Sequence, residues 1–222
     1  MSETVESREH LLNLARDHAL QGNTYRDLVI AGISVSHADF GGSIFERVNM
    51  VEVDLRGADL SRASLKQADM RKAMLDGGML HRTSISDSDL TETDLSRAHF
   101  EDAEITRVSL MNVGMGGARL VSTRFNEANL ARARFEGAVL IKCSFSFSPT
   151  SPYSMMRARF ARATLIECDL SGANLIGADF SDALLIKCNL RGAQMARTNL
   201  EGARLLACQT LGADLPDTFT RR

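Results

Sequence analysis

The sequence predicts an all-β solenoid, and three regularities lead to this fold class. Every fifth residue from Phe40 to Leu215 is large and apolar: 34 of these 36 positions hold Leu, Phe, Ile or Met, and the exceptions are Thr150 and Thr210. The residue two positions earlier is small in nearly every unit, with 19 Ala among the 36. Twelve of the 16 glycines stand two positions after the large apolar residue. A period held over this length is typical of a repeat architecture.

Each five-residue unit combines an extended stretch with a bend. In Ala58-Asp59-Leu60 a polar residue separates a small and a large apolar one, which is the alternation of a strand with one buried face. Glycine tolerates positive φ, so its recurrent position indicates a turn. A helix does not fit, because a period of five moves successive Leu side chains about 140° around a helix of 3.6 residues per turn. We therefore expect two inward side chains per unit and a core of stacked units.

This Ala-(Asp/Asn)-Leu-x-x pattern, seen again at Ala173-Asn174-Leu175, resembles the pentapeptide-repeat family over roughly 180 of the 222 residues. The resemblance implies a right-handed quadrilateral β-helix, in which four units make one square coil of about 20 residues. It implies about nine coils and a rod about 43 Å long at the ~4.8 Å spacing of neighbouring strands. We expect this β-helix to occupy residues 25–217, with residues 218–222 as a tail.

Residues 1–24 are expected to cap the N-terminal end. The pattern from Glu3 to Leu20 predicts an amphipathic α-helix, with Leu11, Leu12 and Ala15 along one stripe. A solenoid needs a cover for the apolar end of its first coil, so a lid is the favoured interpretation. The alternative is a helix that docks a partner.

One segment, residues 146–154, interrupts the repeat. Two of the three prolines lie here, and Tyr153 stands where a small residue belongs. Proline cannot donate to a ladder between coils, so the sequence predicts an extruded loop or, alternatively, a distorted coil. Gyrase-protecting members of the family carry loops that matter for their activity. By that resemblance Phe147 and Tyr153 are candidate contact residues.

Basic residues gather in the segment that precedes and follows this interruption. Residues 111–160 contain 2 acidic and 7 basic side chains, all seven at outward positions. We interpret them as a solvated face or as a docking patch for an acidic protein surface or phosphate. The candidate partner-binding arginines are Arg119, Arg124, Arg132, Arg134, Arg157 and Arg159. With a net charge of −2 and no interleaved aromatics, direct nucleic-acid binding is not expected.

The remaining reactive side chains give no catalytic pattern. All four cysteines (Cys143, Cys168, Cys188 and Cys208) occupy the small inward position, so we expect buried, inert thiols. His81 and His99 stand at outward positions on what would be adjacent coils. A filled solenoid core leaves no room for a substrate, so we expect no enzymatic activity, no metal and no cofactor.

The chain contains no apolar run of about 18 residues, so we expect no membrane span. Residues 1–10 lack the basic and apolar regions of a secretory signal, and nothing favours an oxidising compartment. The sequence therefore predicts a cytoplasmic protein, and the family resemblance implies a bacterial one.

The sequence is compatible with three functions. The leading one is a non-catalytic protein–protein interaction module, a scaffold that presents flat faces to a protein partner. The second is a DNA-mimicking protein that protects DNA gyrase or another topoisomerase, or confers immunity. The third is an accessory or effector protein of a bacterial secretion system. In each case we expect a homodimer through the C-terminal coils, with Leu211, Leu215 and Phe219 at the junction.

Overall fold

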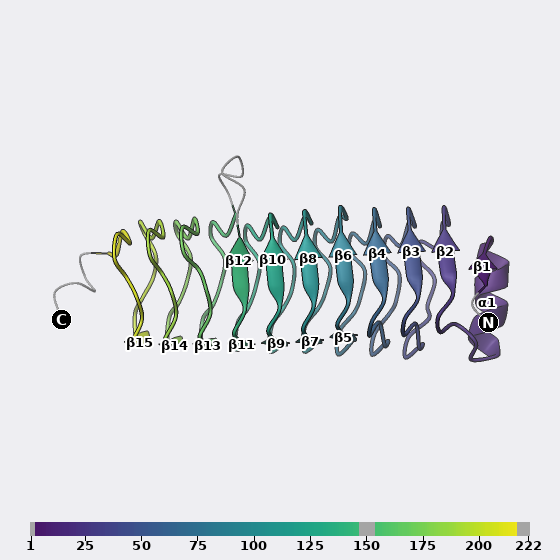
Figure 1. Ribbon diagram of the computed structural model, residues 1–222, viewed down its shortest axis with the longest axis horizontal. Helices are drawn as coiled ribbons and strands as arrows, with labels where there is room; N and C mark the ends of the chain where they lie inside the picture. Colours follow the sequence, from purple (N-terminus) through teal and green to yellow (C-terminus); the bar gives the residue numbers. More distant parts are fainter. Residues whose placement is uncertain (1–2, 147–153, 217–222) are drawn as a thin grey trace.

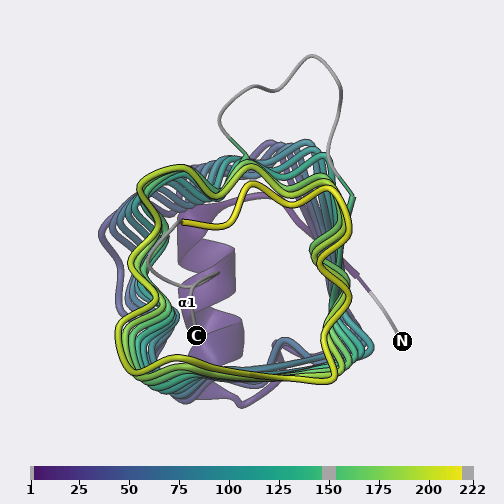
Figure 2. The ribbon, with the colours of Figure 1, turned by 90° about the vertical axis from the view of Figure 1, so that its left-hand side faces the viewer.

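The computed structural model describes residues 3–146 and 154–216, which wind into a rod of square cross-section (Figures 1 and 2). The chain makes about ten turns, where the sequence predicts about nine. Helix α1 (Arg8–Arg16) lies across the N-terminal end of the rod and is seen behind the coils in Figure 2. The expected β-solenoid with a capping helix is therefore present.

Two neighbouring faces of the rod carry regular strands, all paired in parallel. The eight-stranded sheet contains β1 (Thr4–Val5), β2 (Thr24–Arg26), β3 (Ile44–Glu46), β4 (Ser64–Lys66), β6 (Ser84–Ser86), β8 (Glu104–Thr106), β10 (Arg124–Asn126) and β12 (Ser144–Ser146). The seven-stranded sheet contains β5 (Met79–His81), β7 (His99–Glu101), β9 (Arg119–Val121), β11 (Val139–Ile141), β13 (Thr164–Ile166), β14 (Leu184–Ile186) and β15 (Arg204–Leu206). Isolated parallel bridges such as Asn49 with Asp69 connect the coils elsewhere.

The period of five predicts the core correctly. The large and the small residue of each unit are buried along most of the described rod, and one continuous hydrophobic cluster results. Equivalent residues stack on successive coils, for example Phe125 against Phe145, whose ring centroids lie 4.9 Å apart. Phe160 and Phe180 stack in the same way at 4.7 Å. Burial in this fold therefore depends on the coils above and below and not on one coil alone.

Every described corner places its second residue in the left-handed region. The twelve glycines at this position have φ between 65° and 73°. The other residue types at this position have φ between 51° and 62°, and they account for all remaining positive-φ residues except His18. Several corners also close the hydrogen bond of a β-turn, as where Ala63 N–H donates to the Leu60 carbonyl at 2.9 Å. A type II turn requires positive φ at its third residue, which explains the glycine phase.

The polar residue between the two inward ones also has a local role. The Asp59 carboxylate accepts a hydrogen bond from the Ser61 N–H at 2.8 Å, and the Asn174 amide oxygen accepts from Ile176 N–H at 3.1 Å. Asp and Asn side chains bond in this way to the backbone two residues ahead and favour turns. The repeated Asp and Asn residues therefore hold the corners.

One coil is longer than the others by a single repeat unit. Phe125 pairs with Phe145, which is the regular separation of one coil. Val139 pairs with Thr164 and Arg134 with Arg159, and each of these separations is one unit greater. The additional unit falls between Phe145 and Met155, and the columns resume in phase after it. Residues 147–153, which include most of the predicted loop, lie outside the described residues.

The N-terminal segment differs from its prediction. The helix does not run from Glu3 to Leu20: Thr4–Val5 forms β1 and pairs with Thr24–Tyr25, and the helix begins only at Arg8. The Ser7 hydroxyl caps it by accepting from His10 N–H at 3.1 Å. Val5 is fully buried, because β1 adds one further strand to the first coil. The apolar stripe is real but short, and within it Leu11 is fully buried.

Candidate partner-binding surface

The extra unit brings four of the predicted arginines together. Arg134 and Arg159 are bridge partners, and Arg132 N–H donates to the Met156 carbonyl beside Arg157. These four side chains, Arg132, Arg134, Arg157 and Arg159, lie on two adjacent coils at one corner and the face beyond it, and we call them the arginine cluster. Arg119 and Arg124 lie elsewhere, on strands β9 and β10 of the two sheets. The structure therefore brings four of the six predicted arginines together and places Arg119 and Arg124 apart from them.

Most of the arginine cluster has no acidic partner in the described part of the chain. Arg159 Nε lies 2.8 Å from Glu136 Oε1, but no described carboxylate lies within 4.0 Å of Arg132, Arg134 or Arg157. Arg134 leans over Gly114, where its Nη2 would be 3.2 Å from an added Cβ. The cluster thus presents positive charge outward from a rigid backbone.

The N-terminal half of the rod behaves differently, because many of its carboxylates are paired. Arg47 bonds Asp27 on the preceding coil at 2.6 Å, and Arg107 bonds Asp87 in the same way at 2.6 Å. The Arg47 guanidinium holds the pKa of Asp27 below its usual range, and Arg107 does the same for the pKa of Asp87. Such pairing interrupts the continuous negative surface that a DNA mimic requires.

The predicted loop has a described base. Ser154 is buried, its carbonyl accepts from Leu130 N–H at 2.7 Å, and its hydroxyl accepts from Asn174 N–H. Arg157 follows three residues later, so the base of the extra unit lies close to the arginine cluster. The candidate contacts Phe147 and Tyr153 lie outside the described residues.

The four cysteines form one column. The extra unit brings Cys143 into line with Cys168, Cys188 and Cys208, whereas the regular separation alone would align only the last three. Each thiol donates to the carbonyl of a large residue on the preceding coil, for example Cys188 Sγ to Leu165 O at 3.4 Å. The neighbouring Cys143 thiol raises the pKa of Cys168 to about 12, and Cys168 raises the pKa of Cys188 to about 11. These thiols are free, and Cys208 is partly exposed.

The last described coils leave apolar side chains in contact with water. Leu211 is 79% exposed, Leu206 is 41% exposed, and Leu205 and Leu215 are only partly buried. Leu140, in the same inward column as Leu205, is fully buried in the middle of the rod, whereas Leu206 and Leu211 stand at outward positions. Phe219 lies outside the described residues.

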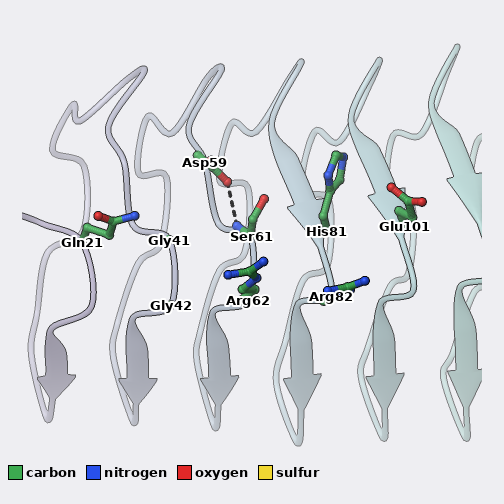
Figure 3. Close-up of a pocket in the computed structure, with 9 residues that line it drawn as sticks. All are labelled: Gln21, Gly41, Gly42, Asp59, Ser61, Arg62, His81, Arg82 and Glu101. Carbon is green, nitrogen blue, oxygen red and sulfur yellow. Dashed lines mark hydrogen bonds between the residues drawn. The ribbon is translucent and has the colours of Figure 1, made fainter.

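The surface also contains a shallow polar groove of about 440 Å³ near the N-terminal end (Figure 3). Gly41 and Gly42 line it on the coil that follows Gln21. Charges of both signs line it: Arg62, Arg82, Asp59 and Glu101. His81 belongs to this groove and also shares a smaller one with His99. Among residues 3–146 and 154–216, no group of three or more His, Cys, Asp or Glu side chains is arranged to hold a metal ion.

The fold and its unbroken columns define a square parallel β-solenoid, a class of repeat protein. A family model described as "Pentapeptide repeats (8 copies)" matches residues 34–71, 49–87, 80–115, 117–148, 154–192 and 173–208. The chain therefore belongs to the pentapeptide-repeat family, and its fold is the right-handed quadrilateral β-helix of that family.

Comparison with solved structures finds other pentapeptide-repeat chains. HetL, a pentapeptide repeat protein involved in heterocyst differentiation regulation in the cyanobacterium Nostoc sp. strain PCC 7120, is 23% identical with a TM-score of 0.54, over 96% of this chain and 98% of HetL. QnrB1, a plasmid-mediated fluoroquinolone resistance protein, is 15% identical with a TM-score of 0.47, over 96% of this chain and 87% of that one. The similarity to HetL concerns the fold. No curated protein matches the chain.

In the described part of the chain, no helix is both long and apolar enough to cross a membrane.

Proposed function

We propose that this protein is a non-catalytic scaffold that binds a protein partner through the arginine cluster. The observation that carries the proposal is the stacking of Arg132 over Arg157 and of Arg134 over Arg159, with one acidic partner among the four in the described chain. Unpaired surface guanidinium groups on a rigid support favour bidentate contacts with carboxylates or phosphates. The described thiols are all free, which suits a reducing compartment such as the cytoplasm.

Affinity capture from the source cell tests this proposal when it is run on matched variants. We expect Arg132→Glu with Arg157→Glu to lose a partner that the parent retains, and raised salt to release the same partner. Arg197→Glu is the control, because Arg197 stands at the same corner position two coils beyond Arg157. A partner that is lost equally with the control variant would contradict the assignment to the cluster.

Protection of a topoisomerase is the second candidate, and the extra unit between Phe145 and Met155 supports it. We propose that this unit forms an extruded loop with Phe147 and Tyr153 at the contact. In gyrase supercoiling and drug-protection assays the parent should then act at micromolar concentration, and deletion of residues 146–154 should abolish the effect. The paired carboxylates of the N-terminal half weigh against this candidate.

We further propose a homodimer through the C-terminal coils. Exposed Leu211 and partly buried Leu215 provide apolar surface there, and the coil edge offers unpaired backbone groups. A two-fold contact would bury both ends at once and double the length of the rod. Light scattering should give twice the chain mass of 24.3 kDa, and Leu211→Asp with Phe219→Asp should return it to the monomer without melting the N-terminal coils. A parent mass near that of one chain would exclude this dimer.

A further inference from the structure

In the seven-stranded sheet, the outward side chain that follows the buried centre of each strand changes from polar to aliphatic along the rod. After the buried centre of each strand, β5 and β7 carry His81 and Glu101. From β9 onward the same column holds aliphatic residues, which stack in register: Val121, Ile141, Ile166, Ile186 and Leu206. The column before the centre adds Val139 and Leu184, so both outward columns are aliphatic on β11 and β14.

We call Val121, Ile141, Ile166, Ile186 and Leu206, together with Val139 and Leu184, the aliphatic face. The other outward residues of these five strands, β9, β11, β13, β14 and β15, are Arg119, Thr164 and Arg204. Most residues of the aliphatic face are half-buried because each covers its neighbours on the next coil, and Leu206 is 41% exposed. The adjacent eight-stranded sheet is different: on the strands beside this face, β10 and β12, the outward residues are Arg, Asn and Ser. β-branched residues favour strands anywhere, but a contiguous apolar surface confined to one side of the rod is typical of a contact site.

The corners that border the aliphatic face carry opposite charges on the same coil. Arg162 lies at the corner before β13 and Glu167 at the corner after it. On the next coil the signs are reversed, with Asp182 before β14 and Lys187 after it. Lys187 Nζ also lies 3.8 Å from Glu167 Oε1, which stands at the corresponding corner of the preceding coil in the same chain.

This arrangement is complementary to itself. If two rods lie side by side in the same direction, related by a two-fold axis along the rod, each corner meets the opposite corner of the other copy. Arg162 then faces Glu167 and Asp182 faces Lys187. Between them Thr164 faces Ile166 on one coil, and Leu184 faces Ile186 on the next. Complementary potentials of this kind contribute more to the specificity of a contact than to its strength.

We propose that the aliphatic face is a lateral dimer interface, and that its occupant is a second copy of this chain in parallel orientation. The contact is isologous and therefore closed. Five coils at ~4.8 Å and a face about five residues wide give about 400 Å² of flat area per copy. A standard interface buries about 800 Å² per partner, so this dimer is a weak one with a dissociation constant in the micromolar range.

The lateral contact is separable from the end-to-end dimer proposed above, because the two bury different surfaces. An end-to-end dimer is about twice as long as one rod, whereas a lateral dimer has the length of one rod and twice its thickness. The experiment therefore uses the full chain with Leu211→Asp and Phe219→Asp, which removes the end contact. Sedimentation equilibrium and small-angle scattering at roughly 10 to 500 µM give the mass and the shape.

In that background we expect reversible dimerisation with no increase in length. Ile166→Arg should weaken it by at least about tenfold, since a charge then enters the centre of the contact from both copies. Ser61→Arg is the matched control, because Ser61 stands in the same outward column on the polar half of the rod, and it should leave the association unchanged. Circular dichroism confirms that both variants are folded.

Exchange of the charges at positions 162 and 167 distinguishes a parallel from an antiparallel dimer. Glu167→Arg alone should weaken the dimer, and Glu167→Arg with Arg162→Glu should restore it if the rods are parallel. In an antiparallel contact centred between β13 and β14, Arg162 would face Asp182, so the double variant would stay weak and overturn the parallel arrangement.

A monomer at every concentration, or an association that Ile166→Arg and Ser61→Arg affect equally, would overturn the interface. If the chain stays monomeric and Ile166→Arg instead loses another protein in affinity capture, the occupant of the aliphatic face is not a second copy of this chain.

Discussion

At several small inward positions, one hydrogen bond recurs between a polar side chain and the preceding coil. The Thr83 and Thr93 hydroxyl groups donate to the carbonyls of Leu60 and Met70 on the preceding coil, at 2.8 Å. Cys188 uses the same geometry. In the described chain no buried side-chain nitrogen or oxygen lacks a partner. The small inward position therefore accepts a hydroxyl or thiol because the preceding coil offers a carbonyl there.

A charged residue at the large inward position has no such partner. Leu130 is fully buried, and we expect Leu130→Asp to destabilise the surrounding coils by about 3–5 kcal/mol, because an unpaired charge would be buried. Asn129→Asp is the control: Asn129 is outward, and a carboxylate there can still accept from the Ala131 N–H. Urea unfolding followed by circular dichroism compares the two. Equal midpoints for both variants would disprove the inward assignment.

The thiol column predicts a loss of stability in alkali. The unfolded chain forms thiolates near about pH 8.5, whereas Cys188 and Cys168 in the fold have raised pKa values of about 11 and 12. Above about pH 9 the unfolded state therefore loses protons first, so stability falls as the pH rises toward the folded pKa values. Cys168→Ala with Cys188→Ala should flatten this part of the profile of melting temperature against pH. An unchanged slope would show that the column does not cause it.

The four thiols differ in their exposure to solvent, and this difference predicts the order in which they react. Cys208 is partly exposed while the other three are buried. A maleimide should therefore modify Cys208 first in the native protein, and the others only after denaturant is added. Rapid native modification of Cys143 would contradict the burial of the column.

At the scale of the element, the corner is the unit that constrains the sequence. Its second residue has positive φ in all described units, yet most of these residues are not glycine. A non-glycine residue in this region costs roughly 1 kcal/mol, so the fold tolerates a small strain many times over. The outward charges that replace glycine there, such as Arg47 and Asp27, bond between coils and offset part of it.

Exchanges at single corners should shift stability in opposite directions. Gly192 has φ of 66° with open space around an added Cβ, so Gly192→Ala should cost about 1 kcal/mol from backbone strain alone. Ser122 has φ of 51°, and Ser122→Gly should gain a similar amount. For a chain of this size each change corresponds to about 2–4 °C in melting temperature. Calorimetry should therefore show shifts of opposite sign.

The elements that the sequence predicts well are those that repeat. Burial of Leu60, Leu130 and Phe160 follows from the period alone, since each unit repeats the same local chemistry. The helix is predicted too long because the alternation at Thr4–Val5 spans only two residues, and its pairing with β2 depends on contacts distant in sequence. The arginine cluster and the aliphatic face depend on which residues of successive coils lie side by side. Both therefore become visible only with the longer coil, which brings Ile141 beside Ile166.

The whole molecule is a stack in which each coil contacts mainly its neighbours. Its stability is then a sum of unit and interface contributions, and opening begins at the ends. Among the described strands β15 has one neighbour, and its central Leu205 is only partly buried. Phe125 in β10, by contrast, is fully buried between β8 and β12.

Hydrogen exchange measures this gradient directly. We expect the amides of β15 to exchange fastest among the strands and those of β8 to β11 slowest, with protection rising over a few coils from each end. If the end-to-end dimer forms, protection of β15 should rise with protein concentration and fall again in Leu211→Asp. Uniform protection along the rod would show that unfolding is all-or-none.

The longer coil also indicates how such a protein can change its length in evolution and in the laboratory. An insertion of one whole unit keeps every later inward side chain inward, whereas an insertion of one or two residues would turn apolar residues outward in the rest of the rod. Gene duplications and deletions are therefore tolerated in steps of five codons. The site between Phe145 and Met155 already accommodates such a step, so it is the natural place to graft a foreign peptide whose two ends lie close together.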